Sequence, residues 1–245
     1  VAMTLDEAIN GLKDIFSGAF GKAGAEVVIE EFMEGEEASF FILSDGKNIL
    51  PIGTAQDHKR VFDGDTGPNR GGMGAYSPAP IMTKDVTSKA ISQIIQPTID
   101  EMAKRGIPYQ GVLYAGFMIK DGEPKLVEYN VRFGDPECQV LMMRLGAQAL
   151  DAMLACAKGE LNNYKLNWAD DHALTIVYAA KGYPGTYEKG SKILGLDKIS
   201  ETTNIQVFHA GTKEEENNII ATGGRVLNIT ARGSSLNEAH RLAYE

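Results

Sequence analysis

The 245-residue sequence has few cysteines and no long apolar run, and each scarcity excludes a class of protein. Its two cysteines, Cys138 and Cys156, provide neither a disulfide framework nor a metal-ligand spacing. No stretch approaches the roughly 20 apolar residues that a membrane-spanning helix needs, and the first residues lack the basic and apolar regions of a signal peptide. We therefore expect a cytoplasmic protein that does not associate with membranes.

Basic residues are also scarce. The sequence has 24 Lys and Arg against 33 Asp and Glu, which gives a formal net charge of -9 at pH 7. This balance argues against a nucleic-acid partner, since binding to a phosphate backbone depends on clustered Lys and Arg. The remaining composition, 43% hydrophobic and 23% charged, is typical of a globular chain. A chain of this length can bury a sizeable core in one or two domains.

The most informative segment is Leu126-Val-Glu-Tyr-Asn-Val-Arg-Phe-Gly-Asp-Pro-Glu137, whose first half alternates as a β-strand does. One face is expected to be polar, with Glu128, Asn130 and Arg132, and the other to join the core, with Val127, Tyr129 and Val131. Oxygen atoms of Glu128 and Asn130 are close enough to contact one hydrated divalent ion, and Arg132 is then suited to a phosphate bound to it. An edge strand with solvated charges is the alternative interpretation of this segment alone.

A second segment combines cations with glycines. Gln56-Asp-His-Lys-Arg60 precedes a stretch with five glycines between Gly64 and Gly74, mixed with Asp, Asn, Thr and Pro. We expect this stretch to be neither a regular helix nor a regular strand, with backbone N–H groups that can converge on an anion. An apparent strand before it and a helix starting near Thr83 favour a ligand loop over a linker.

The periodicity and turn residues along the chain predict a mixture of helices and strands. Helices are expected from the capping box at Thr4 to Gly18, from Thr83 with a break or kink at Pro97, and over 145–158 and 235–244. Strands are expected at 26–33, 38–43, 48–54, 112–119, 124–130, 173–180, 205–210 and 225–231. The pattern indicates an α+β body rich in antiparallel pairs, a boundary near residues 160–164, and a small α+β domain after it.

These segments resemble the phosphoribosylamine-glycine ligases, a family of the ATP-grasp superfamily. The resemblance rests on residues 27–39, 56–60, 67–78 and 128–137, and on residues 179–185 and 224–230 for a C-terminal domain. It implies a partial ATP-grasp domain of antiparallel sheets and packed helices at residues 1–163, followed by an incomplete C-terminal domain at residues 164–245. The family's N-terminal domain and glycine-rich flap are expected upstream of Val1, so the chain is interpreted as a fragment that is inactive by itself.

The resemblance also implies the chemistry, in which ATP and Mg²⁺ or Mn²⁺ drive the joining of glycine to 5-phosphoribosylamine through a glycyl phosphate in purine synthesis. By position, Glu128 and Asn130 match the metal ligands, and Arg132 matches the catalytic cation near the transferred phosphate. The implied ATP-binding residues are the adenine hinge Glu30, Glu31, Phe32 and Met33, the ribose carboxylate Glu37 and the phosphate contact Lys59. The implied substrate-binding residues are Asp65, Asn69, Gly71, Gly72 and Asp135.

Two other functions stay open at this point. A different ATP-grasp carboxylate-amine ligase needs the same metal strand, and the run from Gly67 to Pro78 is the feature that favours the family named above. A non-catalytic nucleotide-binding module is the other alternative. The residues upstream of Val1 would separate that module from a truncated enzyme.

Overall fold

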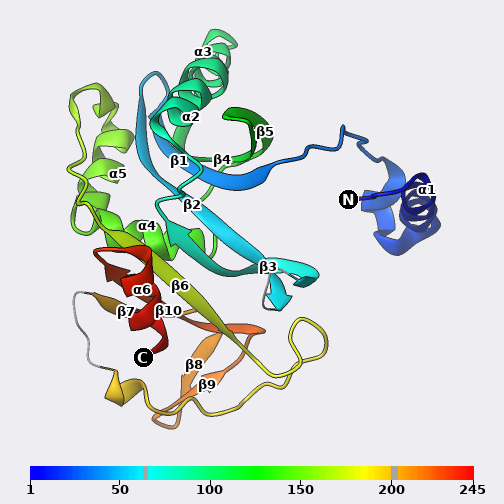
Figure 1. The fold of residues 1–245 in the computed structure, drawn as a ribbon, viewed down its shortest axis with the longest axis vertical. Helices are drawn as coiled ribbons and strands as arrows, with labels where there is room; N and C mark the ends of the chain where they lie inside the picture. The colour runs from blue at the N-terminus through cyan, green and yellow to red at the C-terminus, as the bar shows by residue number, and fades with distance from the viewer. Residues whose placement is uncertain (63–65, 200–203) are drawn as a thin grey trace. The chain divides into compact units, whose positions relative to one another are not determined.

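A computed structural model describes residues 1–62, 66–199 and 204–245, with the side chains of 59–62 and 66–70 left out (Figure 1). The chain divides into two compact units, Val1–Gly35 and Glu36–Glu245. Each unit is described by itself. The second carries most of the predicted site.

The first unit begins with the predicted helix. Helix α1 (Leu5–Asp14) starts at Thr4, whose Oγ1 accepts a hydrogen bond from the Glu7 N–H at 3.2 Å. It continues into a π-helical turn, η1 (Ile15–Ala19), and a 3-10 turn, η2 (Gly21–Ala25). The strand predicted at 26–33 is wrong: no strand is assigned there, and Val28 and Ile29 are 82% and 77% exposed. A strand needs a neighbour that supplies backbone hydrogen bonds, and an apolar run alone cannot provide one.

The second unit is built on an antiparallel sheet with the strand order β5-β4-β1-β2-β3-β6-β10-β7. This confirms the expected α+β class with antiparallel pairing. The strands are β1 (Glu36–Asp45), β2 (Ile49–Phe62), β3 (Thr66–Ser77), β4 (Gln110–Lys120), β5 (Glu123–Asn130), β6 (His172–Ala179), β7 (Ile205–His209) and β10 (Arg225–Gly233). Strand β2 connects the two halves of the sheet, because residues 49–55 pair with β1 and residues 56–62 pair with β3.

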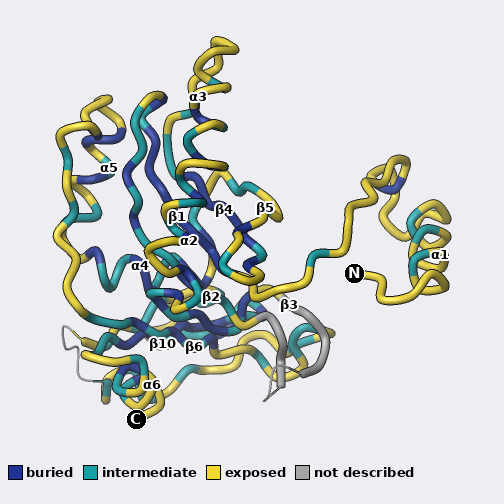
Figure 2. Tube along the Cα trace, turned by 45° about the horizontal axis from the view of Figure 1, so that its top comes forward, coloured by how far each residue is buried: buried dark blue, intermediate teal, exposed yellow. Residues whose placement is uncertain are grey.

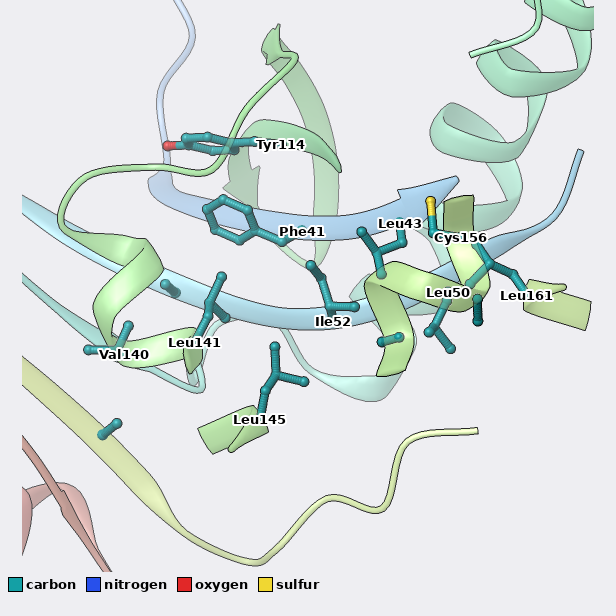
Figure 3. Close-up of a cluster of buried hydrophobic side chains, with 14 of the residues drawn as sticks. Phe41, Leu43, Leu50, Ile52, Tyr114, Val140, Leu141, Leu145, Cys156 and Leu161 are labelled. Carbon is teal, nitrogen blue, oxygen red and sulfur yellow. The ribbon is translucent and has the colours of Figure 1, made fainter. Parts of the chain in front are cut away.

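Strand β1 is buried on both faces, which explains its continuous apolar run (Figure 2). On one face Phe41 and Leu43 join a core formed with α4 (Glu137–Leu145) and α5 (Gln148–Lys158). Figure 3 shows Phe41 between Tyr114 and the apolar side chains of these helices. On the other face Phe40 and Ile42 pack with residues of α2 (Lys84–Lys89), η3 (Ala90–Ile95) and α3 (Gln96–Lys104).

Two predicted helices differ in detail from the structure. The helix expected from Thr83 is divided into α2, the π-helical turn η3 and α3, and Pro97 lies in the first turn of α3, directly after η3. The helix predicted at 145–158 is α5, which begins three residues later, at Gln148. The sequence did not predict α4, which ends at Leu145 just before Gly146, a residue with a φ of 56°. Among the described residues no single helix is long and apolar enough to cross a membrane, although α4 and α5, bent by 100°, meet that test as a pair.

The C-terminal part contains the predicted strands β6, β7 and β10 and the helix α6 (Leu236–Tyr244), capped by Ser235. It also contains a short hairpin that the sequence did not predict, β8 (Thr212–Glu215) and β9 (Asn218–Ala221). Charged residues hide the alternation of this hairpin, and its turn residues Glu216 and Asn217 have positive φ angles. Short 3-10 turns lie at Leu161–Asn163 and Leu196–Lys198. Because β3 pairs with β6, the sheet crosses the boundary predicted at residue 163, and that division stays a prediction.

The glycine-rich stretch is more regular than expected. It forms β3, which pairs with β2 through Asn69 opposite Arg60 and Gly74 opposite His58. The register shifts between these two pairs, so residues 70–73 stand opposite a single residue of β2. The expectation of no strand was therefore wrong for the ends of the stretch, where the partner strand decides the conformation, whereas its middle departs from a regular ladder.

Candidate functional site

The predicted metal ligands lie together at the end of β5. Glu128 is opposite Gly116, and Asn130 is opposite Tyr114, in the ladder between β5 and β4. The Asn130 side-chain amide donates a hydrogen bond to Glu128 Oε1 at 3.0 Å. The polar face expected from the alternation is therefore present at these two residues.

The apolar face of the same strand is not as predicted. The ladder shifts between Gly116 and Phe117, which leaves Val127 as an extra residue in β5. Val127 is 37% exposed and Val131 is 72% exposed, whereas Tyr129 packs against the core beneath α3. The prediction that Val127 and Val131 belong to the core was wrong, because the bulge interrupts the two-residue alternation and the strand ends at Asn130.

The pair of Glu128 and Asn130 fits a hard divalent cation. A 180° rotation of the Asn130 amide exchanges its nitrogen and oxygen, so its oxygen can take the place now 3.0 Å from the carboxylate oxygen. Adjacent ligands of an octahedral Mg²⁺ with bonds of about 2.1 Å are about 3.0 Å apart. Within the described ranges no group of three or more His, Cys, Asp or Glu could hold a metal ion. A cation at this pair can complete its shell with water or ligand oxygens, as Mg²⁺ commonly does.

A buried chain of hydrogen bonds supports the sheet next to this pair. The Ser39 hydroxyl donates to Tyr114 Oη at 2.7 Å, and the Tyr114 hydroxyl donates to Glu137 Oε1 at 3.0 Å. Burial, followed by the charge of Glu137, raises the pKa of Tyr114 far above its usual range. The phenol therefore stays protonated and remains a donor to the carboxylate. These hydrogen bonds join β1, β4 and the start of α4. They therefore fix the position of Tyr114, which is opposite Asn130 in the ladder.

Arg132 and Cys138 lie on either side of the turn that follows β5. Arg132 is exposed, and its Nη1 donates a hydrogen bond to the Phe133 carbonyl at 2.8 Å. Burial raises the pKa of the Cys138 thiol, and the carboxylates of Asp135 and Glu137 raise it further. A raised pKa disfavours the thiolate, which is the form of cysteine that acts as a nucleophile.

Asp135, a predicted substrate residue, is held by an arginine from β10. Arg225 Nη2 lies 2.9 Å from Asp135 Oδ2, and Arg225 Nη1 donates to the Asp135 carbonyl at 2.9 Å. The same Nη1 donates to the Gly72 carbonyl at 3.2 Å. One guanidinium therefore joins the turn after β5 to the glycine-rich strand.

The two segments also pack directly on each other at Gly72. A Cβ atom added to Gly72 would lie 2.4 Å from Pro136 Cδ, whereas one added to Gly71 would have Arg225 Cζ, at 3.8 Å, as its nearest neighbour. Only glycine therefore fits at Gly72, because the proline ring cannot move away without moving the backbone. The structure brings the predicted substrate residues Gly71, Gly72 and Asp135 into one cluster.

The predicted ATP-binding residues are only partly placed. Glu37 lies at the start of β1, where its carbonyl accepts a hydrogen bond from Gln56 Nε2 at 3.2 Å. The hinge residues Glu30, Glu31, Phe32 and Met33 lie in the first unit, in an irregular stretch. Asp65 and the side chains of Lys59 and Asn69 fall outside the described residues. The hinge and these three residues therefore stay predictions.

Sequence reasoning missed Tyr114, Glu137 and Arg225. Tyr114 is in a predicted strand whose apolar pattern indicates only a core residue, and Glu137 ends the segment 126–137 without a predicted role. Arg225 begins a predicted strand, 90 residues from Asp135 and 153 from Gly72. Nothing in the spacing of a single sequence indicates such a contact.

Comparison with known proteins gives the same family over most of the chain. The family model described as Phosphoribosylglycinamide synthetase, ATP-grasp (A) domain, matches residues 1–138, and the C-domain model of the same synthetase matches residues 173–245. The phosphoribosylamine-glycine ligase of Brucella melitensis is 55% identical over the whole chain. The chloroplastic ligase of Arabidopsis thaliana is also 55% identical over the whole chain. The chain spans 57% and 47% of the lengths of these two relatives.

Solved structures agree at the level of the fold. The crystal structure of phosphoribosylamine-glycine ligase from Thermotoga maritima has a TM-score of 0.85 and 33% identity, and the alignment covers 98% of this chain and 59% of that one. A biotin carboxylase domain from Hydrogenobacter thermophilus, in complex with MgADP and bicarbonate, has a TM-score of 0.65 at 15% identity, covering 94% and 49% of the two chains. The second likeness shows a shared fold and nothing more.

Proposed function

Because the chain belongs to the phosphoribosylglycinamide synthetase family, we propose that the protein carrying it uses ATP to join glycine to 5-phosphoribosylamine in de novo purine synthesis. The products are glycinamide ribonucleotide, ADP and phosphate. The observation that carries the proposal is the contact between Glu128 and Asn130 at the end of β5, and the cluster of Gly71, Gly72 and Asp135 at the turn after it supports the proposal further. We place this activity in the cytoplasm, as the sequence suggests, and treat residues 1–163 and 164–245 as its ATP-grasp and C-terminal domains.

The proposed reaction has two steps that conserve every atom. A glycine carboxylate oxygen attacks the γ-phosphorus of ATP, the bond to the ADP oxygen breaks, and glycyl phosphate forms. The amine nitrogen of phosphoribosylamine then attacks the acyl carbon, phosphate leaves, and the nitrogen loses a proton. The main obstacle is charge, because the carboxylate and the triphosphate are both negative.

The residues of this chain address that obstacle in different ways. Glu128 and Asn130 would hold Mg²⁺ or Mn²⁺, which neutralises phosphate charge when bound. Arg132 follows Asn130 by two residues. Its guanidinium is proposed to leave the Phe133 carbonyl and to bind the transferred phosphate. Glu30, Glu31, Phe32 and Met33 are proposed to contact adenine. Lys59 is proposed to contact phosphate, and Asp65, Asn69, Gly71, Gly72 and Asp135 to bind the two substrates.

The direct test is an assay of ADP formation by the full-length protein. We expect ADP to form only when glycine, phosphoribosylamine and a divalent cation are all present. The matched controls omit one substrate at a time or replace glycine with alanine. ADP formation that does not depend on glycine would reject this function and favour another ATP-grasp ligase or a nucleotide-binding module.

Glu37 provides a test that separates nucleotide affinity from chemistry. We expect Glu37→Ala to raise the KM for ATP about tenfold and to keep most of kcat, since a contact to the ribose is similar in the ground and transition states. Steady-state kinetics with varied ATP measures both constants. Glu36→Gln is the control, because it removes a neighbouring charge but keeps an acceptor for Gln56, 2.6 Å away. A collapse of kcat without a change in KM would move Glu37 to the reacting centre.

A further inference from the structure

The C-terminal region contributes one side chain to the cluster of predicted substrate residues. Arg225 is the first residue of β10 and is opposite Ala179 of β6. The ladder shifts between Arg225 and Leu227, so Val226 is an extra residue there and is buried in the small C-terminal core. This bulge fixes the start of the strand, and the Arg225 side chain reaches away from it toward the turn after β5.

The contacts of Arg225 join the turn after β5 to the glycine-rich strand, in addition to the packing of Gly72 on Pro136. Its Nη1 donates to two backbone carbonyls, those of Asp135 and Gly72, and its Nη2 pairs with the Asp135 carboxylate. The guanidinium is planar and rigid, so three contacts from one group fix both segments relative to each other. The side chain is 26% exposed, and partial burial strengthens charge-assisted hydrogen bonds.

Resting on the function proposed above, we propose that Arg225 is a positioning residue for the substrates. Its contacts are with Asp135 and Gly72, and it acts through these two residues. By holding the turn after β5 against the glycine-rich strand, it sets the shape of the substrate end of the site. The C-terminal domain thereby controls substrate affinity across the predicted domain boundary.

The kinetic test compares Arg225→Ala and Arg225→Lys with the wild type in the full-length protein. We expect Arg225→Ala to raise the KM for glycine or for phosphoribosylamine about tenfold or more, as expected for lost hydrogen bonds to a charged group. The KM for ATP stays within about twofold. Arg225→Lys recovers part of the loss, because one ammonium can pair with Asp135 but cannot also bond both carbonyls in a fixed plane.

Arg232 is the matched control, since it lies on the same strand with similar side-chain exposure, 31% against 26%. Its Nε lies 3.4 Å from Asp171 Oδ2, and its Nη1 donates to the Met143 carbonyl, so it joins β10 to α4 and to no predicted substrate residue. Arg232→Ala is expected to change thermal stability and to leave all three KM values unchanged. If Arg225→Ala behaves like Arg232→Ala, Arg225 has only a structural role and the proposal is wrong.

A double-mutant cycle with Asp135→Ala tests whether Arg225 affects the substrate KM through Asp135. If Arg225 acts through Asp135, the double variant has a KM close to that of Asp135→Ala alone. Additive effects would overturn the proposal, because they mean that Arg225 contacts a substrate independently.

Hydrogen–deuterium exchange tests the positioning role of Arg225 without any measurement of enzyme activity. We expect Arg225→Ala to speed exchange at residues 71–73 and 133–137, and Arg232→Ala to leave both segments unchanged. Unchanged exchange in Arg225→Ala would reject the positioning role even in an active enzyme. A wild type without glycine-dependent ADP formation would reject the proposed function instead, and exchange would still decide whether Arg225 orders the two segments.

Discussion

Glu128→Ala is expected to abolish glycine-dependent ADP formation at ordinary Mg²⁺ concentrations, with a loss of at least about a hundredfold in kcat. The carboxylate is the only charged member of the pair with Asn130, so its removal leaves one neutral oxygen ligand for the cation. The charge of the triphosphate then remains unscreened against the incoming carboxylate. The measurement is a coupled ADP assay over a range of Mg²⁺ concentrations.

Two further variants sharpen this test. Glu128→Gln keeps an oxygen ligand without the charge, and we expect part of its activity to return at high Mg²⁺. Glu123→Ala is the matched control, because Glu123 lies on the same strand and pairs with Lys89 at 2.6 Å, away from Asn130. Near-normal turnover of Glu128→Ala at ordinary Mg²⁺ would remove Glu128 from the metal site.

Gly72→Ala is expected to lower kcat/KM about a hundredfold, although it adds only one methyl group. The added Cβ would lie 2.4 Å from Pro136 Cδ, so either the glycine-rich strand or the turn after β5 must move. Displacement of positioned groups by about 1 Å can cost a factor of about 100 in rate. Steady-state kinetics and a thermal melt of the same sample separate a displaced site from an unfolded protein.

The neighbouring glycine gives the control for this prediction. A Cβ at Gly71 would meet no atom closer than the Arg225 guanidinium at 3.8 Å, which is ordinary van der Waals contact. We therefore expect Gly71→Ala to lower kcat/KM much less than Gly72→Ala does. Equal effects at the two positions would mean that flexibility of the glycine-rich strand matters more than its packing on Pro136.

Features that depend on neighbouring residues could be predicted from the amino-acid sequence. The capping box at Thr4, the helix that follows it and the alternation that places Glu128 beside Asn130 are all local. The long motifs also identified the family, because they combine many residues in order. None of these required knowledge of what lies across the sheet.

Features that depend on a distant partner could not be predicted and required the three-dimensional structure. Residues 27–34 include apolar residues, but no strand is assigned to pair with them. Val127 is an exception to the two-residue alternation of β5, because the register between β4 and β5 shifts at this residue. The glycine-rich stretch becomes β3 because β2 pairs with it. Arg225 reaches Asp135 and Gly72 because the sheet continues from β3 through β6 to β10. In each case strand pairing sets the outcome, and strand pairing depends on hydrogen bonds between residues far apart in the chain.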